Sequence, residues 1–495
     1  MMATWTGKGP WSLRRGQADA LKPVVKAFAC GYVSSTLPRL PATVKTLLAS
    51  DLAVQQKLEL LTSALTSSVG INRFPTSCAL IVGGSTLLPR LLRSILLWLR
   101  QHVPLHVFVR LLNVIIREAT LVSAFVSAWV AFRLLNKDDG WARRQANSRV
   151  EQIRPTLDSP NQHHLPPPGY HMQYAGKTID FTLFAFCRAI DVAVISAWIS
   201  SRGTSFHPEL MVPKLTSLVK TLADPWVFST SSAVIMWSWF FAPDRLPKTY
   251  NQWISRIAEI DNRLIQALRL CRQGDLVYGS STTKDADLPS LCKELNLPQV
   301  WGNPTITVPI PCELYHCGAG KSCEVHAVRR FWKAFSSAMR LYLPLQFISH
   351  VRRPTFDYRR MSNVVVGAAR SSSFLAAFVS LFYYAVCLAR TRLGPKIFSR
   401  TVTPQMWDSG LCVLAGCLAC GWSILLENAS RRQDIAFFVA PRALATLLPR
   451  VYDRRFQRRE QIVFATSVAI VMSAVQKKHH NVRGVFGKFL EGVLR

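Results

Sequence analysis

Eight apolar runs follow one another along this chain, and they limit the possible folds more than any other feature. They span residues 78–99, 119–135, 179–199, 226–241, 364–388, 410–426, 435–448 and 462–475. A helix needs about 20 apolar residues to cross a bilayer, and shorter runs insert when they pack together. Arg, Trp and Tyr flank the runs, as at membrane interfaces. The pattern predicts an all-α, polytopic integral membrane protein with about eight spans. The alternative is a large soluble protein that buries the same helices.

The charge of the chain predicts an anionic partner. Lys and Arg total 60 against 28 Asp and Glu, a formal net charge of +32. Nucleic acid and a membrane surface both attract such a chain. The basic residues here punctuate the apolar runs, whereas a nucleic-acid binder concentrates them on polar modules or tails. We therefore expect a lipid bilayer with anionic headgroups as partner, and no nucleic acid.

The two halves of the chain resemble each other segment by segment. VFSTSSAVIMWSW from Val227 matches VFATSVAIVMSAV from Val463, and VKAFACGYVSSTLPRL from Val25 matches WKAFSSAMRLYLPLQF from Trp332. Each copy has one amphipathic helix followed by four apolar segments. The pattern predicts an internal repeat of two homologous four-helix halves.

Composition shifts along the chain predict its domain boundaries. The predicted parts are an N-terminal tail (1–20), a first membrane repeat (21–273) with a long polar loop (136–177), a linker (274–310), a cysteine-rich module (311–327) and a second membrane repeat (328–495). Small residues at Ser123, Ser127 and Ala131 in one run, and at Gly416 and Cys420 in another, predict close helix packing.

Five metal-ligand side chains lie within fifteen residues of the cysteine-rich module: Cys312, His316, Cys317, Cys323 and His326. Thiolates and imidazoles are the usual zinc ligands, and Gly318 and Gly320 allow the tight turns of a metal loop. The spacing is not that of a well-known zinc finger. Zinc binding, a disulfide and plain structural thiols all remain open.

An acid and an arginine lie eight residues apart in the third segment of each half: Asp180 with Arg188, and Asp434 with Arg442. Eight residues make a little over two helical turns, so both side chains project from broadly one face. A charge in an apolar run is costly unless it is paired or hydrated. These residues are candidates for lining a polar pathway. Alternatively, the acids lie at the membrane edge and the arginines pair structurally or extend to the interface.

Enzyme signatures are missing from the sequence. It contains no P-loop, GxSxG, HExxH or dinucleotide-binding fingerprint. We therefore predict no enzymatic activity and no cofactor other than zinc at the cysteine-rich module.

The central module and the runs after it resemble the transmembrane protein 135 family. The resemblance rests on Pro311-Cys312, Cys317, Cys323, the segment YLPLQF (342–347) and the apolar runs that follow in the same order. That family is distantly similar to the Tim17/Tim22/Tim23 group. The resemblance implies a peroxisomal or mitochondrial membrane protein that acts in organelle dynamics and lipid handling, without enzymatic activity.

Three functions follow as hypotheses. The first is a carrier or conduit for lipid or small solutes, which takes such a molecule as substrate. The second is a membrane scaffold, which associates with itself or with other membrane proteins. The third is a protein-translocation component, by analogy with the Tim17 group. Likeness of fold by itself does not decide among them.

Overall fold

The computed structural model describes residues 10–49, 54–102, 118–137, 174–201, 213–280, 286–351, 358–398, 401–477 and 482–494. Helices form nearly all of this part, which confirms the predicted all-α fold class. The chain divides into two compact units, Met1–His207 with Pro449–Arg495 (unit 1) and Pro208–Leu448 (unit 2). The predicted long loop lies mostly outside the described residues.

Unit 1 combines the N-terminal helices with the C-terminal end of the chain. Its elements are α1 (Pro10–Thr36), α2 (Leu40–Ala49), α3 (Val54–Thr66), α4 (Phe74–His102), α6 (Ala119–Leu135), β1 (Tyr174–Ala175), α8 (Ile179–Ser201), β2 (Tyr452–Asp453), η8 (Arg454–Phe456), α20 (Gln457–Lys477) and α21 (Gly484–Leu494). The two-residue strands β1 and β2 pair antiparallel, with Tyr174 opposite Asp453.

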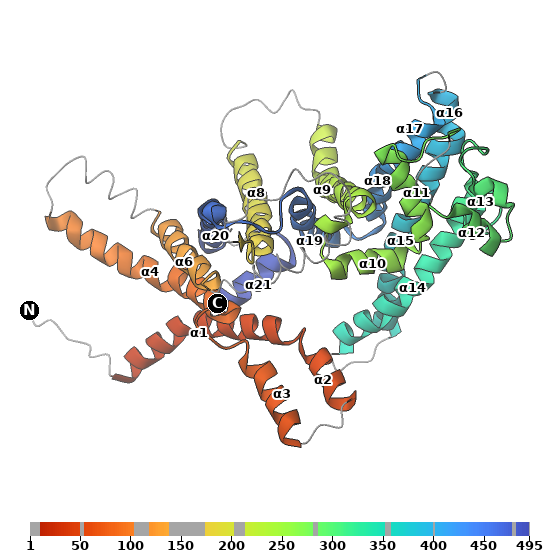
Figure 1. Cartoon of the computed structure of the whole chain (residues 1–495). Coiled ribbons are helices and arrows are strands. Elements are labelled where there is room, and N and C mark those ends of the chain that lie inside the picture. The colour runs from red at the N-terminus through yellow and green to blue at the C-terminus, as the bar shows by residue number, and fades with distance from the viewer. Residues whose placement is uncertain are drawn as a thin grey trace, which may run out of the picture. The chain divides into compact units, whose positions relative to one another are not determined.

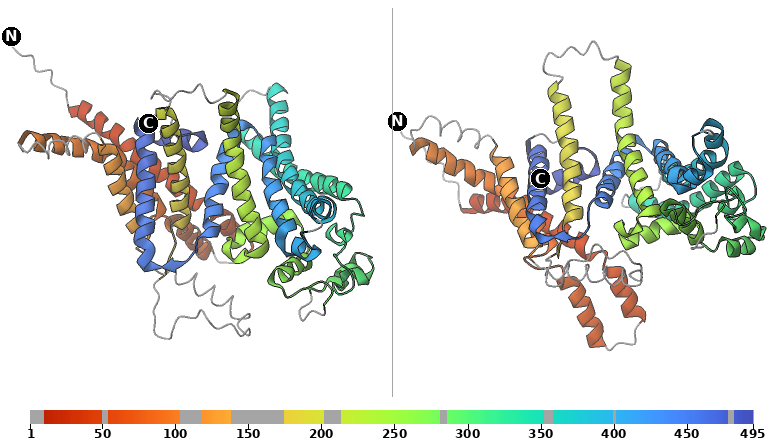
Figure 2. Two further views of the ribbon diagram at one scale, coloured as in Figure 1. Left: turned by 90° about the horizontal axis from the view of Figure 1, so that it is seen from above. Right: turned by 45° about the horizontal axis from the view of Figure 1, so that its top comes forward.

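Helix α4 packs on α1 and α6, and α20 packs on α6 and α8. Figure 2 shows α8 (yellow) beside α20 (dark blue). Small side chains permit the close contact between α4 and α6, because Ser123, Ser127 and Ala131 are all buried in α6. A Cβ added at Gly84 of α4 would lie 1.8 Å from the Ser127 Oγ. The predicted close packing at this run is confirmed.

Unit 2 contains the central half of the chain. Its elements are α9 (Pro213–Phe241), η3 (Pro243–Arg245), α10 (Lys248–Ala258), α11 (Asn262–Gln273), α12 (Leu288–Glu294), η4 (Gln299–Gly302), α13 (Cys312–Tyr315), α14 (Cys323–Val351), α15 (Tyr358–Cys387), η5 (Leu388–Arg392), α16 (Leu393–Ile397), α17 (Pro404–Met406), η6 (Trp407–Leu411), α18 (Cys412–Cys420), η7 (Gly421–Leu426) and α19 (Ala429–Leu447). Segments η5 and η6 are π-helical.

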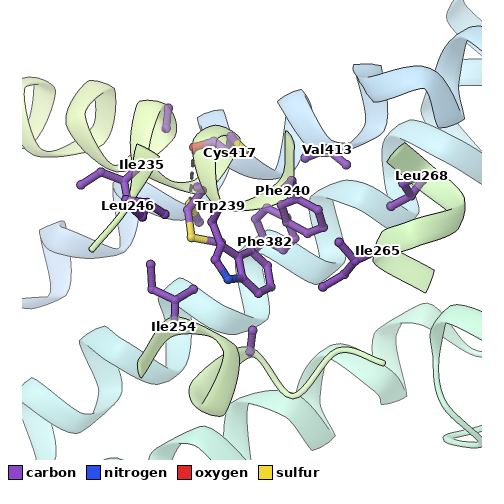
Figure 3. Packing of buried hydrophobic residues seen from close by; sticks show 14 of the residues in the cluster. Ile235, Trp239, Phe240, Leu246, Ile254, Ile265, Leu268, Phe382, Val413 and Cys417 are labelled. Carbon is purple, nitrogen blue, oxygen red and sulfur yellow. Dashed lines mark hydrogen bonds between the residues drawn. The ribbon is translucent and has the colours of Figure 1, made fainter. Parts of the chain in front are cut away.

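In unit 2, α14 lies along α15, α15 packs on α18, and α9 packs on α18 and α19 (Figure 1). Buried aromatic and aliphatic side chains hold these helices together, among them Trp239, Phe240, Phe382 and Val413 (Figure 3). The rings of Phe240 and Phe382 stack with centroids 5.4 Å apart.

The predicted linker 274–310 is part of this folded unit. Helix α12 packs on α11 and η4. Leu276, Leu288, Leu291 and Ile310 form a buried cluster with residues of α11. The polar composition of the linker concealed these apolar residues, which are enough for a small core.

Two helical stretches among the described residues are long and apolar enough to cross a membrane, Met361–Ile397 and Pro404–Leu426. The predicted run at Ala119–Leu135 is apolar but shorter. The larger number of eight spans stays a prediction.

The compact units divide the chain differently from the predicted repeats. Helix α9 belongs to the first predicted repeat but packs with helices of the second in unit 2. Helix α20 belongs to the second predicted repeat but packs with helices of the first in unit 1.

Candidate metal centre

Four metal-ligand side chains converge in unit 2: Cys312, His316, Cys323 and Cys387. Their ligand atoms all lie within 4.8 Å of one another. Cys312 begins the single turn of α13, and His316 follows four residues later on the same side. Cys323 begins α14, and Cys387 ends the α-helical part of α15. Cys323, Cys387 and His316 are buried.

A tight reversal of the chain brings the first three ligands together. Three residues between His316 and Cys323 have left-handed backbones, with φ of 51° at Cys317, 78° at Gly318 and 94° at Gly320. Glycine adopts this conformation without a steric cost, so the two glycines serve the turns predicted from the sequence.

The His316 ring is oriented for metal binding. Its Nδ1 lies 2.7 Å from the Gly320 carbonyl oxygen, so an Nδ1–H donates to that oxygen. This tautomer leaves the lone pair of Nε2 available, and Nε2 lies 3.5 Å from the Cys387 Sγ. Histidines that bind metals commonly donate their other ring N–H to a backbone carbonyl in this way.

The surroundings of Cys312 favour its thiolate form. A hydrogen bond with Cys387 lowers the pKa of Cys312 to about 4; burial opposes this shift, and the neighbouring His316 supports it. Burial raises the pKa of Cys323. Thiolates are the form that binds metals.

The donor set fits zinc. Three cysteines and one histidine form one of the usual tetrahedral zinc sites, with Zn–S distances of about 2.3 Å. Such a tetrahedron holds its ligand atoms about 3.7 Å apart. The four ligand atoms already lie within 4.8 Å of one another, so small side-chain rotations would bring them to these separations.

The other two predicted ligands, Cys317 and His326, lie outside this group of four. The Cys317 thiol lies 3.8 Å from the Tyr315 carbonyl oxygen. The His326 ring stacks on His316 at 4.5 Å and meets Tyr383 edge-on at 5.3 Å. Burial lowers the pKa of His326 to about 3, so its ring is neutral. His326 therefore packs behind the ligand His316.

All twelve cysteines lie in the described part of the chain, and each is a free thiol. Cys387 was absent from the predicted set because it lies 64 residues beyond Cys323, inside a predicted apolar run. The sequence feature that could have identified Cys387 as a ligand is its position at the end of that run, just before Arg390 and Arg392.

A buried ion pair lies one turn beyond Cys387. Arg390 and Asp408 are 3% and 0% exposed. Arg390 donates from Nε to Asp408 Oδ1 at 2.5 Å and from Nη2 to Oδ2 at 2.8 Å. The Tyr278 hydroxyl donates to the same carboxylate, and the Arg390 guanidinium lies 4.3 Å from the Tyr315 ring centroid. The pair joins η5 to η6, the π-helical segments of the two stretches long enough to span a membrane. Sequence reasoning missed it because both residues fall outside the predicted runs.

The four predicted intramembrane charges divide between the units. In unit 1, Asp180 pairs with Arg450 at 3.4 Å. Arg188 is buried, with its guanidinium 5.2 Å from the Phe486 ring centroid. In unit 2, Asp434 lines an apolar cavity, and the Arg442 guanidinium lies 3.6 Å from the Phe438 ring centroid.

Residues 311–451 match a family model described as the N-terminal cysteine-rich region of transmembrane protein 135. This match confirms the resemblance over the part of the chain that holds all four ligands. No curated protein and no solved structure matches significantly. Together with the two long apolar stretches, the match indicates an integral membrane protein.

Proposed function

On the premise that this chain carries the cysteine-rich region of the transmembrane protein 135 family, we propose that it is a membrane protein stabilised by one zinc ion. The ion is held by Cys312, His316, Cys323 and Cys387. The convergence of these four ligand atoms within 4.8 Å carries the proposal.

The zinc has a structural role. Catalytic zinc sites keep one coordination position open for water or substrate, whereas four protein ligands close a tetrahedral site. Two of the ligands come from α13 and the turn that follows it, one from the start of α14 and one from α15. The ion therefore fastens the cysteine-rich segment to a helix long enough to cross the membrane.

The test is the metal content of the full chain purified in detergent. We expect about one zinc per chain by mass spectrometry, and loss of that zinc in Cys387→Ser and Cys323→Ser. Cys317→Ser and Cys292→Ser are matched controls, since neither thiol belongs to the group of four, and both should keep the metal. Zinc-free wild-type protein, or equal loss in the control variants, would overturn the proposal.

At the level of the cell, the protein handles lipid or small solutes in peroxisomal or mitochondrial membranes, as a carrier or conduit. The family match and an apolar cavity in unit 2 support this assignment. A non-transporting scaffold or a translocation component is the alternative. Microscopy of the tagged chain followed by alkaline carbonate extraction tests the location: the protein should remain in the membrane pellet of one of these organelles. Release into the supernatant would contradict it.

The two units are copies that exchange their last helix. The supporting observation is that corresponding helices pack in the same order: α1, α4, α6, α20 and α8 in unit 1 correspond to α14, α15, α18, α9 and α19 in unit 2. Exchange of the last helix explains why each predicted repeat, which is continuous in sequence, has helices in both compact units.

A further inference from the structure

Unit 2 contains a half-open cavity of about 520 Å³. Helices α9, α10, α14, α15 and α19 contribute its walls. Ile235, Trp239, Ile254 and Phe382, shown in Figure 3, are among the lining residues. The cavity lies apart from the four metal ligands, none of which lines it.

Its size and lining indicate a binding site. Protein interiors contain few voids larger than a water molecule, whereas ligand sites occupy about 300 to 1,000 Å³. The walls are aromatic and aliphatic almost throughout, and water is poorly held where polar partners are scarce. An apolar ligand gains most from entering such a space.

The position of the cavity identifies the kind of ligand. One wall is formed by Phe374, Phe378 and Val379 of α15. These residues belong to Met361–Ile397, which is long and apolar enough to cross a bilayer. Under the proposed membrane function this helix lies among lipid tails, so the apolar molecule available to the cavity is a hydrocarbon chain.

Polar groups also line the cavity. Asp434 and Tyr250 are among the lining residues, and the Arg442 guanidinium covers the ring of Phe438, which lines the cavity as well. Pockets for amphipathic ligands combine apolar walls with a few such groups, which fix the orientation of the ligand. We infer that this cavity binds one long acyl chain of a lipid, with the lipid headgroup beside Asp434 and Tyr250. The inference rests on the proposed membrane function and names its substrate class.

The experiment uses the full chain in phosphatidylcholine vesicles that contain a photoreactive diazirine lipid. One arm uses a free C16 fatty acid and the other a phosphatidylcholine with the same labelled chain, which distinguishes the two sources of an acyl chain. After illumination, mass spectrometry locates the labelled peptides. We expect label on cavity residues of α9, α15 or α19 in at least one arm.

Two variants that fill the cavity provide the comparison. Val379→Trp on α15 and Ser232→Phe on α9 each place a large ring in the space, and both positions line it. Leu381→Trp is the matched control, because Leu381 lies on α15, is 37% exposed and does not line the cavity. Cavity labelling should fall several-fold in the filled variants and remain in the control.

Equal labelling in all variants would overturn the inference, since it shows only contact with bulk lipid. The absence of cavity label in both arms would also overturn it. Elution of each variant from a size-exclusion column at the volume of the wild type verifies that it is folded. Carbonate extraction of the same sample separates the two proposals: a retained protein without cavity label refutes only the acyl-chain site, whereas a released protein refutes the membrane function.

Discussion

Unit 1 contains a buried carboxylate that accepts hydrogen bonds from three hydroxyls, whereas unit 2 contains a buried ion pair and a Cys–His cluster. In unit 1, Glu460 of α20 accepts hydrogen bonds from the hydroxyls of Thr178 at 2.7 Å, Thr182 at 2.8 Å, and Tyr452. In unit 2, Arg390 and Asp408 form a buried bidentate pair.

The difference concerns the cost of removing one partner. Neutral hydroxyl donors that lose an acceptor leave dipoles behind, whereas a broken buried ion pair leaves a full charge without compensation. Unit 2 should therefore be the more sensitive of the two to loss of a single polar group.

Asp408→Ala should produce the largest effect. It leaves the Arg390 guanidinium buried without its carboxylate, which costs about 3 to 5 kcal/mol in the free energy of unfolding. The measurement is chemical denaturation in detergent, or Tm where unfolding is irreversible. The control is the double variant Arg390→Met with Asp408→Leu, which removes both charges and should be less destabilised. A double variant less stable than the single one would contradict this explanation.

Glu460→Gln in unit 1 should have a smaller effect. The amide keeps one oxygen acceptor but loses the charge, and hydrogen bonds to a charged group contribute about 1.5 to 3 kcal/mol. The same unfolding assay measures it. If Glu460→Gln destabilises the protein more than Asp408→Ala does, the proposed difference between the units is wrong.

Gly84→Ala should cost about 1 to 3 kcal/mol through overpacking. The new methyl group would meet Ser127 of α6, whose own Cβ lies 2.5 Å from the place that the methyl carbon would occupy. Gly492→Ala is the control, because a Cβ there meets nothing within 4 Å. Rescue of Gly84→Ala by Ser127→Gly would locate the clash, and equal stability of the Gly84 and Gly492 variants would exclude it.

The smallest effect is expected at Lys477 and Glu118, which pair α20 with the start of α6. Both side chains are more than a third exposed, so removing the pair by Lys477→Met should cost about 0.2 to 1 kcal/mol. High salt should reduce the difference from wild type. A salt-independent loss of several kcal/mol would show that this contact is buried in the folded protein.

Several features of the protein follow from the sequence alone. The series of apolar runs predicted the all-α fold, because a run of this length in a membrane satisfies its backbone hydrogen bonds internally as a helix. Cys312, His316 and Cys323 were found because they lie close together in the sequence, within twelve residues that include two glycines. The family resemblance also rests on local motifs, and the match over residues 311–451 confirms it.

Contacts between distant segments were decided only by the tertiary structure. Cys387 completes the candidate metal centre from the end of α15, and Asp408 reaches Arg390 through two π-helical segments. Helix α20 packs with α6 and α8, although more than 250 residues separate it from α8 in the chain. Residue spacing carries no information about such contacts, because the packing of whole helices determines which distant side chains meet.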